Sequence, residues 1–307
     1  MTINDLFEST EPIKKKRKRI LLVDFSALSH STFFVVKSDP TLTSEEDLIN
    51  IWRHTILLSI LTRKNTICPD EIVLCLDYGS WRNDFFKYYK ASRKADKAAS
   101  DIDYQFFYDA SDKFLKEIRE TFPWLIISER GAEGDDCIAI LAHELSKEND
   151  VVVMSSDKDL KQLLYLKNVK FYSYRDDEFQ TIDNPKEYII RHILLGDATD
   201  GIMNIRNPGN CFVAGIRQLP LGPKTVDKIL IEGLEEYLDK NNLHDNYKRN
   251  KTLIELNKNT IPEDIWDNVV DKYNNYDRIK TDFTKMLIFF NKNKLIKLRE
   301  RINEFLN

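Results

Sequence analysis

Residues 151–159 read VVVMSSDKD, an unbroken apolar run that passes directly into a polar turn with two aspartates. An apolar run without polar alternation is typical of a strand that is covered on both faces of a parallel sheet. Similar runs occur elsewhere, with helical periodicity between them. The strands are expected at Ile20–Val23, Ile72–Leu76, Leu125–Ile127, Val151–Met154 and Val169–Tyr172. The helices are expected at Ser44–Arg63, Tyr104–Thr121, Gly134–Ser146, Lys158–Leu166 and Lys186–Leu195. This alternation predicts an α/β fold with helices on both faces of the sheet.

Acidic residues stand where these strands end. Asp24 and Asp77 directly follow the first two strands, and the sequences GAEGDD, SSDKD and GDATDG carry further acids. Because sites in open parallel sheets form outside the carboxyl ends of the strands, we expect the acids to converge at one edge. The candidate metal ligands are Asp24, Asp77, Glu133, Asp135, Asp157, Asp159, Asp197 and Asp200.

A cluster of this size would repel itself and raise its own pKa values, so it requires cations. Mg²⁺ prefers oxygen ligands and commonly acts on phosphate substrates. Two Mg²⁺ ions, for which Mn²⁺ can substitute, are therefore the expected cofactor, and a pair of metals suits the displacement of a phosphodiester. Single acids such as Asp24 or Asp157 could instead cap the helices that follow them. Capping is a poor explanation for acids at four strand ends.

The segment 81–100 is basic and aromatic. Four of its basic residues recur at helical spacing and would share one helix face. That face could hold phosphates while an aromatic ring stacks on an unpaired base. The alternative is an ordinary amphipathic helix whose aromatic residues are core. The basic residues are Arg82, Lys87, Lys90, Arg93, Lys94 and Lys97.

A second candidate contact for nucleic acid is the sequence GPKT, which opens a helix. Backbone N–H groups at Gly222, with Lys224 and Thr225 beside them, would bind phosphate without regard to base sequence. Gly-Pro before a helix is otherwise only a turn signal.

Composition narrows the class of protein. The chain of 307 residues has a formal charge of −4, and with 42% hydrophobic and 31% charged residues it can bury a core, which excludes wholesale disorder. No apolar run approaches the ~18 residues of a membrane span, and no signal peptide is expected. Four cysteines without a CxxC pair argue against a zinc site or disulfides, and a reducing cytoplasm fits.

Three parts are expected along the chain. Residues 1–19 form a flexible arm whose basic run, Lys14–Arg19, could be a localisation signal, a phosphate-contacting arm or a solvated lead-in. Residues 20–200 form the α/β core with the basic segment 81–100. Residues 201–307 form a helical C-terminal region, because strand signals stop near Asp200.

The order and spacing of the motifs resemble those of the flap endonuclease, or structure-specific 5′-nuclease, family over about residues 20–230. The motifs are LLVDFS, IVLCLD, WRNDFFKYYKASRK, EGDD, SSDKD, GDATDG and GPKTVDKIL. The resemblance implies a PIN-like α/β nuclease core with a helical arch, a helix-three-turn-helix DNA clamp and a helical C-terminal part. It implies 5′→3′ exonuclease and 5′-flap endonuclease activity on RNA–DNA and DNA–DNA duplexes, serving primer removal during lagging-strand synthesis.

The resemblance also implies roles for single residues. Tyr89, Lys90 and Arg93 match the base of the arch, where the lysine steadies the scissile phosphate. The first metal would be held by Asp24, Asp77, Glu133, Asp135 and Asp157. The second would be held by Asp157, Asp159, Asp197 and Asp200. Two features depart from the family pattern: Ile205–Gln218 separates the last acids from the clamp, and Gly201 replaces an Asn.

The implied partners are 5′-flap, forked and nicked duplex DNA, RNA–DNA hybrid and a single-stranded DNA-binding protein. The chain is expected to be a monomer in the cytoplasm of a host cell, as for phage-encoded members. The main rival is a non-cleaving protein that binds branched DNA with a nuclease-like fold. A metal-dependent sugar-nucleotide transferase would use a DxD motif such as 157–159, but it has no use for a basic aromatic segment. A small PIN-type ribonuclease would lack the clamp.

Overall fold

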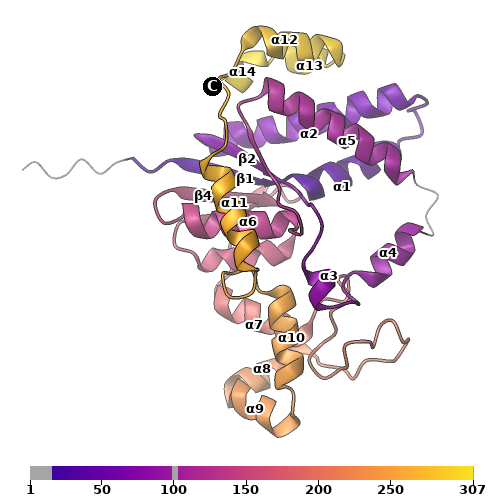
Figure 1. The fold of residues 1–307 in the computed structure, drawn as a ribbon, viewed down its shortest axis with the longest axis vertical. Coiled ribbons are helices and arrows are strands. Elements are labelled where there is room, and N and C mark those ends of the chain that lie inside the picture. Colours follow the sequence, from indigo (N-terminus) through magenta and orange to yellow (C-terminus); the bar gives the residue numbers. More distant parts are fainter. Residues whose placement is uncertain (1–15, 99–102, 307) are drawn as a thin grey trace, which may run out of the picture.

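A twisted six-stranded sheet forms the centre of the molecule (Figure 1). The computed structural model describes residues 16–98 and 103–306, except for the side chains of residues 94–96 and 98. The strand order is β3-β2-β1-β4-β5-β6, and only β6 runs antiparallel to its neighbour. The strands are β1 (Arg19–Asp24), β2 (Glu71–Cys75), β3 (Leu125–Ile127), β4 (Asp150–Ser155), β5 (Val169–Ser173) and β6 (Glu178–Gln180). The five strands predicted from the sequence are confirmed, whereas the short edge strand β6 was missed.

Helices cover both faces of the sheet, as the apolar runs predicted. Along β1, Leu21 and Val23 face one core and Ile20 and Leu22 face the other. The first face carries α1 (Phe25–Lys37), α2 (Glu45–Ile67) and α5 (Tyr104–Thr121). The second carries α6 (Gly134–Leu145) and the 3-10 helix η2 (Lys158–Tyr165). Helix α1 was not predicted, because its sequence is rich in Ser, Thr and Val, which favour helices weakly.

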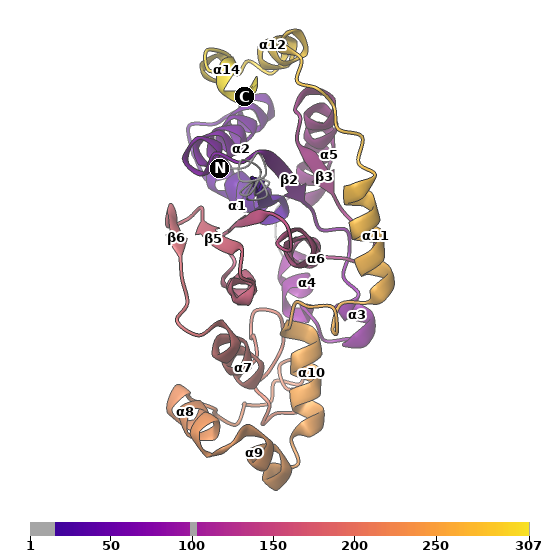
Figure 2. The same cartoon turned by 90° about the vertical axis from the view of Figure 1, so that its left-hand side faces the viewer.

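The C-terminal region, expected to be one unit, is divided in space (Figure 2). Helices α8 (Pro223–Glu232), α9 (Leu234–Asn241) and α10 (His244–Ile254) join α7 (Pro185–Leu195) in a lobe below the sheet. The chain then returns to the sheet: Trp266 of α11 (Glu263–Asn274) is buried against α6, and Phe290 of α12 (Phe283–Lys292) is buried in the core of the first face. Helices α13 (Ile296–Arg299) and α14 (Ile302–Leu306) complete that cover.

The described part of the basic run, residues 16–19, lies at the opposite edge of the sheet from the acids. Arg17 bonds to Asp150 and to the carbonyls of Ser146 and Asn149, and Arg19 bonds to the carbonyl of Ile67. These contacts are at the amino ends of the strands, whereas the acids follow the carboxyl ends. Lys14 and Lys15 lie outside the described residues.

The segment expected to form the arch contains two short helices, α3 (Arg82–Phe85) and α4 (Ala91–Ala98). Helix α4 lies apart from the sheet, on the side of α1 and α5 (Figure 1). Among the described residues, no helix combines the length and apolar character needed to cross a membrane.

Candidate metal centre and nucleic-acid interface

The site begins where the chain reverses direction across the sheet, between β1 and β4. Ligand sites in doubly wound sheets form at this switch point, because the connections leave a crevice there. Ser155 at the end of β4 donates to Asp24 Oδ2 at 2.6 Å, and its Oγ accepts the backbone N–H of Asp157 at 2.9 Å. One buried hydroxyl therefore fixes the acids that follow two adjacent strands. Asp24 also caps α1 through the N–H of Ala27, so capping and a site role coexist.

A second group of acids lies at the start of α6. Asp77 Oδ1 accepts the N–H of Gly134 at 2.6 Å. A Cβ at Gly134 would lie 3.1 Å from that oxygen, so glycine allows the close approach. Glu133 and Asp136 form a capping box at this helix, and Asp135 Oδ1 accepts the N–H of Asp136. Ordinary helix-start geometry therefore brings these acids to the carboxyl edge of the sheet.

The turn between α3 and α4, where the base of the arch is expected, packs against these acids. Lys90 Nζ lies 2.5 Å from Glu133 Oε1 and 3.7 Å from Asp200 Oδ2. Tyr89 donates to Glu133 Oε2 at 2.7 Å and lies 3.1 Å from Asp200 Oδ2, and Arg93 pairs with Asp200 Oδ1 at 2.8 Å. The three residues proposed to act at the phosphate therefore contact two of the proposed metal ligands.

The backbone at Lys90 is held in an uncommon conformation. Its φ is +51°, in the left-handed region that residues with a Cβ occupy at a cost of about 1–2 kcal/mol. Its N–H donates to the carbonyl of Asp200 at 2.8 Å, which ties the turn before α4 to the acidic loop. Such strain persists where the surroundings fix the backbone, and it is concentrated at functional sites.

The departure at Gly201 has a structural reason. Its φ is +75°, and a Cβ there would lie 2.8 Å from the carbonyl oxygen of Tyr88. Because the backbones approach so closely, a larger residue in this conformation would displace the turn that carries Tyr89 and Lys90. Glycine at this position suits the contact between the acidic loop and the arch.

Burial has the largest effect on the pKa values of most of these acids. Burial raises the pKa of Asp24 to about 6, and that of Asp159 to about 7. Burial likewise raises the pKa values of Asp77, Asp135 and Asp200. Glu133 differs, because Lys90 and Arg82 outweigh its burial and lower its pKa.

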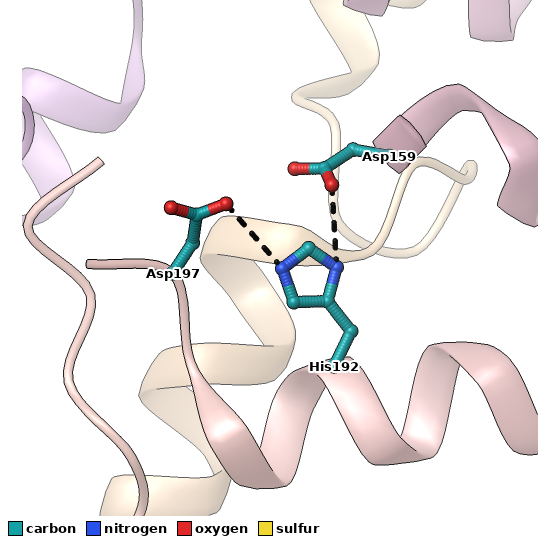
Figure 3. Close-up of side chains that lie close together, drawn as sticks. All are labelled: Asp159, His192 and Asp197. Atoms are coloured by element: carbon teal, nitrogen blue, oxygen red, sulfur yellow. Dashed lines mark ion pairs between the residues drawn. The ribbon is translucent and has the colours of Figure 1, made fainter. Parts of the chain in front are cut away.

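His192 joins Asp159 and Asp197 in a group that sequence reasoning missed (Figure 3). Its two ring nitrogens lie 3.6 Å from Asp159 Oδ1 and 3.6 Å from Asp197 Oδ2. Burial favours the neutral ring, but the two carboxylates outweigh burial and raise the pKa of His192. No signal in one sequence marked this histidine, because its position on α7 becomes meaningful only once η2 packs against that helix.

A cleft of about 1200 Å³ connects the acids to the arch. Its lining includes five of the eight candidate acids and three basic side chains: Asp24, Asp77, Glu133, Asp135, Asp157, Lys90, Arg93 and Lys97. The lining does not include the other three candidate acids. Asp200 forms ion pairs with Lys90 and Arg93. Asp159 and Asp197 lie on either side of the His192 ring. The division of the eight acids between two metal ions stays a prediction.

The structure gives Arg82 a different role from the DNA contact that we expected. Its side chain is 1% exposed and forms a two-pronged ion pair with buried Asp136, at 2.8 and 2.9 Å. It also bonds to the carbonyl of Leu253 and to Glu133. Four of its five N–H donors are used inside the protein and the side chain is buried, so Arg82 is a structural residue that holds α3, α6 and the end of α10 together.

The other basic candidates lie on the surface. Lys87 is exposed, and Lys97 lines the cleft and donates to the Tyr108 hydroxyl at 2.6 Å. The side chain of Lys94 lies outside the described residues. Gly222, Lys224 and Thr225 are exposed at the start of α8, where the N–H of Thr225 bonds to the carbonyl of Gly222. The segment before them is fixed by Asn207, which bonds to the backbone of Leu219 in both directions.

The donor set fits hard divalent cations. Carboxylate oxygens dominate it, and Asp159 Oδ1 is buried without a hydrogen-bond partner. Burial raises the pKa of Asp159 to about 7, so its ionised form is unfavourable in the metal-free protein. A bound cation or a proton would remove the free-energy cost of this buried, unpartnered oxygen.

Comparisons with known proteins agree with this geometry. The family model described as the 5′-3′ exonuclease, N-terminal resolvase-like domain, matches residues 19–190, and that described as T4 RNase H, C terminal, matches residues 184–305. A ribonuclease H of Enterobacteria phage T4 is 30% identical over 302 residues, which cover 94% of this chain and 96% of that protein. A 5′-3′ exonuclease of Bacillus subtilis (strain 168) is 30% identical over 205 residues, covering 62% of this chain and 67% of that protein.

A solved structure shares the fold. The flap endonuclease of bacteriophage T5, in complex with DNA and metal ions, matches with a TM-score of 0.59 and 17% identity, over 83% of this chain and 97% of that chain. The PIN-like α/β architecture expected from the motifs is confirmed. The chain therefore belongs to the 5′-3′ exonuclease family of nucleases, and its C-terminal part is of the phage T4 ribonuclease H type.

Proposed function

We propose that the protein is a divalent-metal-dependent 5′ nuclease with 5′→3′ exonuclease and 5′-flap endonuclease activity. Its proposed substrates are RNA–DNA and DNA–DNA duplexes, and its proposed task is the removal of primers from lagging-strand fragments. The observation that carries this proposal is the cleft in which Lys90 and Arg93 face five carboxylates. Acids alone would repel a polyanion, and basic residues at the same cleft allow a phosphate to approach the metal ligands.

The acids divide into two proposed metal sites. Asp24, Asp77, Glu133, Asp135 and Asp157 lie along the cleft and would hold the first ion. Asp157 is also proposed for the second, with Asp159, Asp197 and Asp200. Two Mg²⁺ ions, when bound, would activate a water and stabilise charge on both oxygens of the displacement. Mn²⁺ is the proposed substitute.

Lys90 and Arg93 are proposed to bind the non-bridging oxygens of the scissile phosphate. The acids beside Lys90 raise its pKa although burial opposes them, so its ammonium group stays charged at neutral pH. Charged donors that are already in place stabilise developing negative charge at little reorganisation cost. The Tyr89 hydroxyl contacts the carboxylates of both Glu133 and Asp200, so its proposed role is to position them.

Nucleic acid outside the cleft would be held by separate surfaces. Lys87, Lys94 and Lys97 on and before α4 are proposed to contact phosphates of the 5′ strand. The exposed start of α8, with Gly222, Lys224 and Thr225, is proposed as the duplex clamp, because the N-terminus of a helix favours phosphate and Lys224 adds a basic side chain there. The similar proteins support this substrate class, since they include a ribonuclease H and a flap endonuclease solved with DNA.

The test is single-turnover cleavage of a 5′-labelled flap duplex with Mg²⁺, combined with equilibrium binding in Ca²⁺ or chelator. Lys90→Ala is expected to lower the cleavage rate at least 100-fold and duplex affinity less than fivefold, because Lys90 acts at the scissile phosphate. Lys87→Ala is the matched control, and it is expected to weaken binding with little change in the single-turnover rate. Equal losses of rate and affinity for Lys90→Ala would reduce Lys90 to an ordinary phosphate contact.

Asp135→Asn separates the proposed nuclease from the rival binding protein. The substitution removes a proposed metal ligand from the cleft and is expected to abolish turnover while it leaves duplex binding largely intact. A wild-type protein that binds flap DNA tightly and never cleaves it would favour the non-cleaving reading. A single-stranded DNA-binding partner, a monomeric state and the cytoplasm of a phage-infected host stay predictions.

A further inference from the structure

The insertion that departs from the family pattern forms a structured loop, residues 206–220, between α7 and α8. Asn207 joins its two ends, because the side-chain amide donates to the carbonyl of Leu219 at 3.1 Å and its oxygen accepts the N–H of Leu219 at 2.7 Å. Arg206 donates to the carbonyl of Pro220 at 2.8 Å. The ends of the loop are therefore held together, and the residues between them form a compact projection.

The loop is anchored against the turn between α3 and α4. Cys211 is fully buried in a hydrophobic cluster with Phe86 and Tyr89 of that turn, and its thiol donates to the carbonyl of Ile216 at 3.0 Å. A Cβ at Gly209 would lie 3.0 Å from the ring of Phe86, so the loop backbone approaches this ring closely. The loop projects from the lobe on the side of the molecule where α4 lies (Figure 1). It therefore lies between two surfaces that are proposed to bind nucleic acid, the turn before α4 and the start of α8.

The loop exposes large apolar side chains to solvent. Val213 is 60% exposed, Leu219 55%, Ile216 50% and Phe212 36%, all within eight consecutive residues. The shape of the loop does not depend on these side chains, since backbone bonds and the buried Cys211 hold it. Exposed apolar groups that gather in this way mark an interaction site.

The charges of the surrounding segment indicate the partner. From Gly201 to Val226 the charged residues are Arg206, Arg217 and Lys224, and the segment has no Asp or Glu. The chain as a whole has a formal charge of −4, so this segment differs from the rest in sign. A basic segment attracts a polyanion, and proteins that bind the minor groove combine basic residues with apolar side chains that enter between base pairs. Nucleic acid therefore fits this loop better than an apolar surface of another protein.

We propose that residues 206–220 form a nucleic-acid wedge, in which Val213 and Ile216 enter the minor groove of the substrate duplex and open a base step. Arg217 contacts the adjacent phosphates. The proposal rests on the proposed function for the presence of a duplex beside the cleft, and it adds a contact with the bases. Phosphate contacts make no use of aliphatic side chains, whereas wedges of this kind bend the duplex and extend its contact with the protein. Because the minor groove distinguishes base pairs poorly, such a contact is largely independent of sequence.

The direct test is the fluorescence of 2-aminopurine, placed in turn at each base pair next to the junction of a 5′-flap duplex. The full-length protein is added in Ca²⁺. This base analogue becomes brighter when it is unstacked, so we expect at least about a twofold rise at one or two adjacent positions. Ile288→Ser, which changes a side chain on α12 that is also 60% exposed, is the matched control and should give the same rise. The double variant Val213→Ser, Ile216→Ser should lose it. A wild-type complex in which no position responds would overturn the proposal.

The salt dependence of duplex affinity separates base contacts from phosphate contacts. Each lost phosphate contact lowers the slope of log affinity against log salt by about 0.9. The double variant Val213→Ser, Ile216→Ser should bind at least about tenfold more weakly with an unchanged slope, because it removes apolar burial alone. Arg217→Ala should lower the slope by about one.

Two results with the double serine variant would contradict the wedge. A lowered slope would make the loop an ordinary phosphate contact. Binding and fluorescence equal to those of the wild-type protein would show that the apolar side chains do not touch nucleic acid, and would favour a partner protein as the occupant. Melting curves confirm that each variant is folded.

The two proposals fail in distinguishable ways. A wild-type protein that cleaves a flap duplex with Mg²⁺ but gives no fluorescence response refutes the wedge alone. A wild-type protein that neither binds nor cleaves the duplex refutes both.

Discussion

Asp24→Asn is expected to stabilise the metal-free protein while it abolishes metal-dependent cleavage. Burial at the end of β1 raises the pKa of Asp24 from 3.8 to about 6. A carboxyl whose folded pKa is raised contributes stability below its unfolded pKa, and that contribution is lost as the pH rises through about 6. At neutral pH the folded chain therefore carries an unfavourable charge that the neutral amide of Asn removes. The single amide oxygen of Asn can keep only one of the two contacts of Asp24, such as that from the N–H of Ala27, and its NH₂ group would then face the Ser155 hydroxyl as a donor.

The size of the effect follows from the pKa difference. At ~1.36 kcal/mol per pKa unit, the charge costs about 3 kcal/mol at pH 7.5 and about 1 kcal/mol at pH 4.5. Loss of the charged acceptor for Ser155 offsets part of this, so a gain of roughly 1–3 kcal/mol is expected at pH 7.5.

Chemical denaturation with chelator, at both pH values, measures this gain. Asp84→Asn, on the exposed surface of α3, is the matched control and should change stability by less than about 0.5 kcal/mol. Added Mg²⁺ should stabilise the wild-type protein and leave Asp24→Asn nearly unchanged. If Asp24→Asn destabilises the metal-free protein at pH 7.5, or stabilises it equally at both pH values, the electrostatic reasoning is wrong.

Three further predictions concern the surroundings of the site. Arg82→Leu should lower the unfolding free energy by about 3–5 kcal/mol, because it leaves the buried Asp136 carboxylate unpaired, and a denaturation midpoint near that of the wild type would contradict this. Gly201→Ala should lower stability by about 1–3 kcal/mol and slow single-turnover cleavage, because its Cβ would meet the Tyr88 carbonyl; a normal rate would show that the arch tolerates the shift. Metal affinity should fall as the pH is lowered from 8 to 6, because protons compete with cations for Asp24 and Asp159; calorimetric titrations that show no dependence on pH would argue against raised pKa values.

Much of the fold and most of the candidate site were accessible from the sequence. Buried parallel strands need continuous apolar runs, so β1 to β5 stand out, and the sheet topology carries the acids that follow them to one edge. The cleft lining brings five of these acids together with Lys90 and Arg93. The apolar runs and the rule that parallel strands end at one edge of the sheet were sufficient for these inferences, because both can be applied to short stretches of sequence.

The failures share a physical cause, which is packing between segments that are distant in sequence. Arg82 reads as one more positive charge in a basic segment, and only its contact with Asp136 and Leu253 shows that it is buried. His192 gains meaning only from the position of η2 beside α7. The return of α11 and α12 to the sheet was missed because an amphipathic helix does not specify which surface it covers.

The most direct test of the central claim is cleavage of a 5′-labelled flap duplex by the wild-type protein and by Asp157→Asn, each with Mg²⁺ and with chelator. Asp157 lies in the cleft and is proposed to serve both metal sites. If the protein is a metal-dependent 5′ nuclease, short 5′ products should appear only when the wild-type protein is supplied with Mg²⁺. Asp157→Asn should bind the duplex without cutting it. Cleavage that survives chelation, or full activity of Asp157→Asn, would contradict the assignment of the acidic cluster.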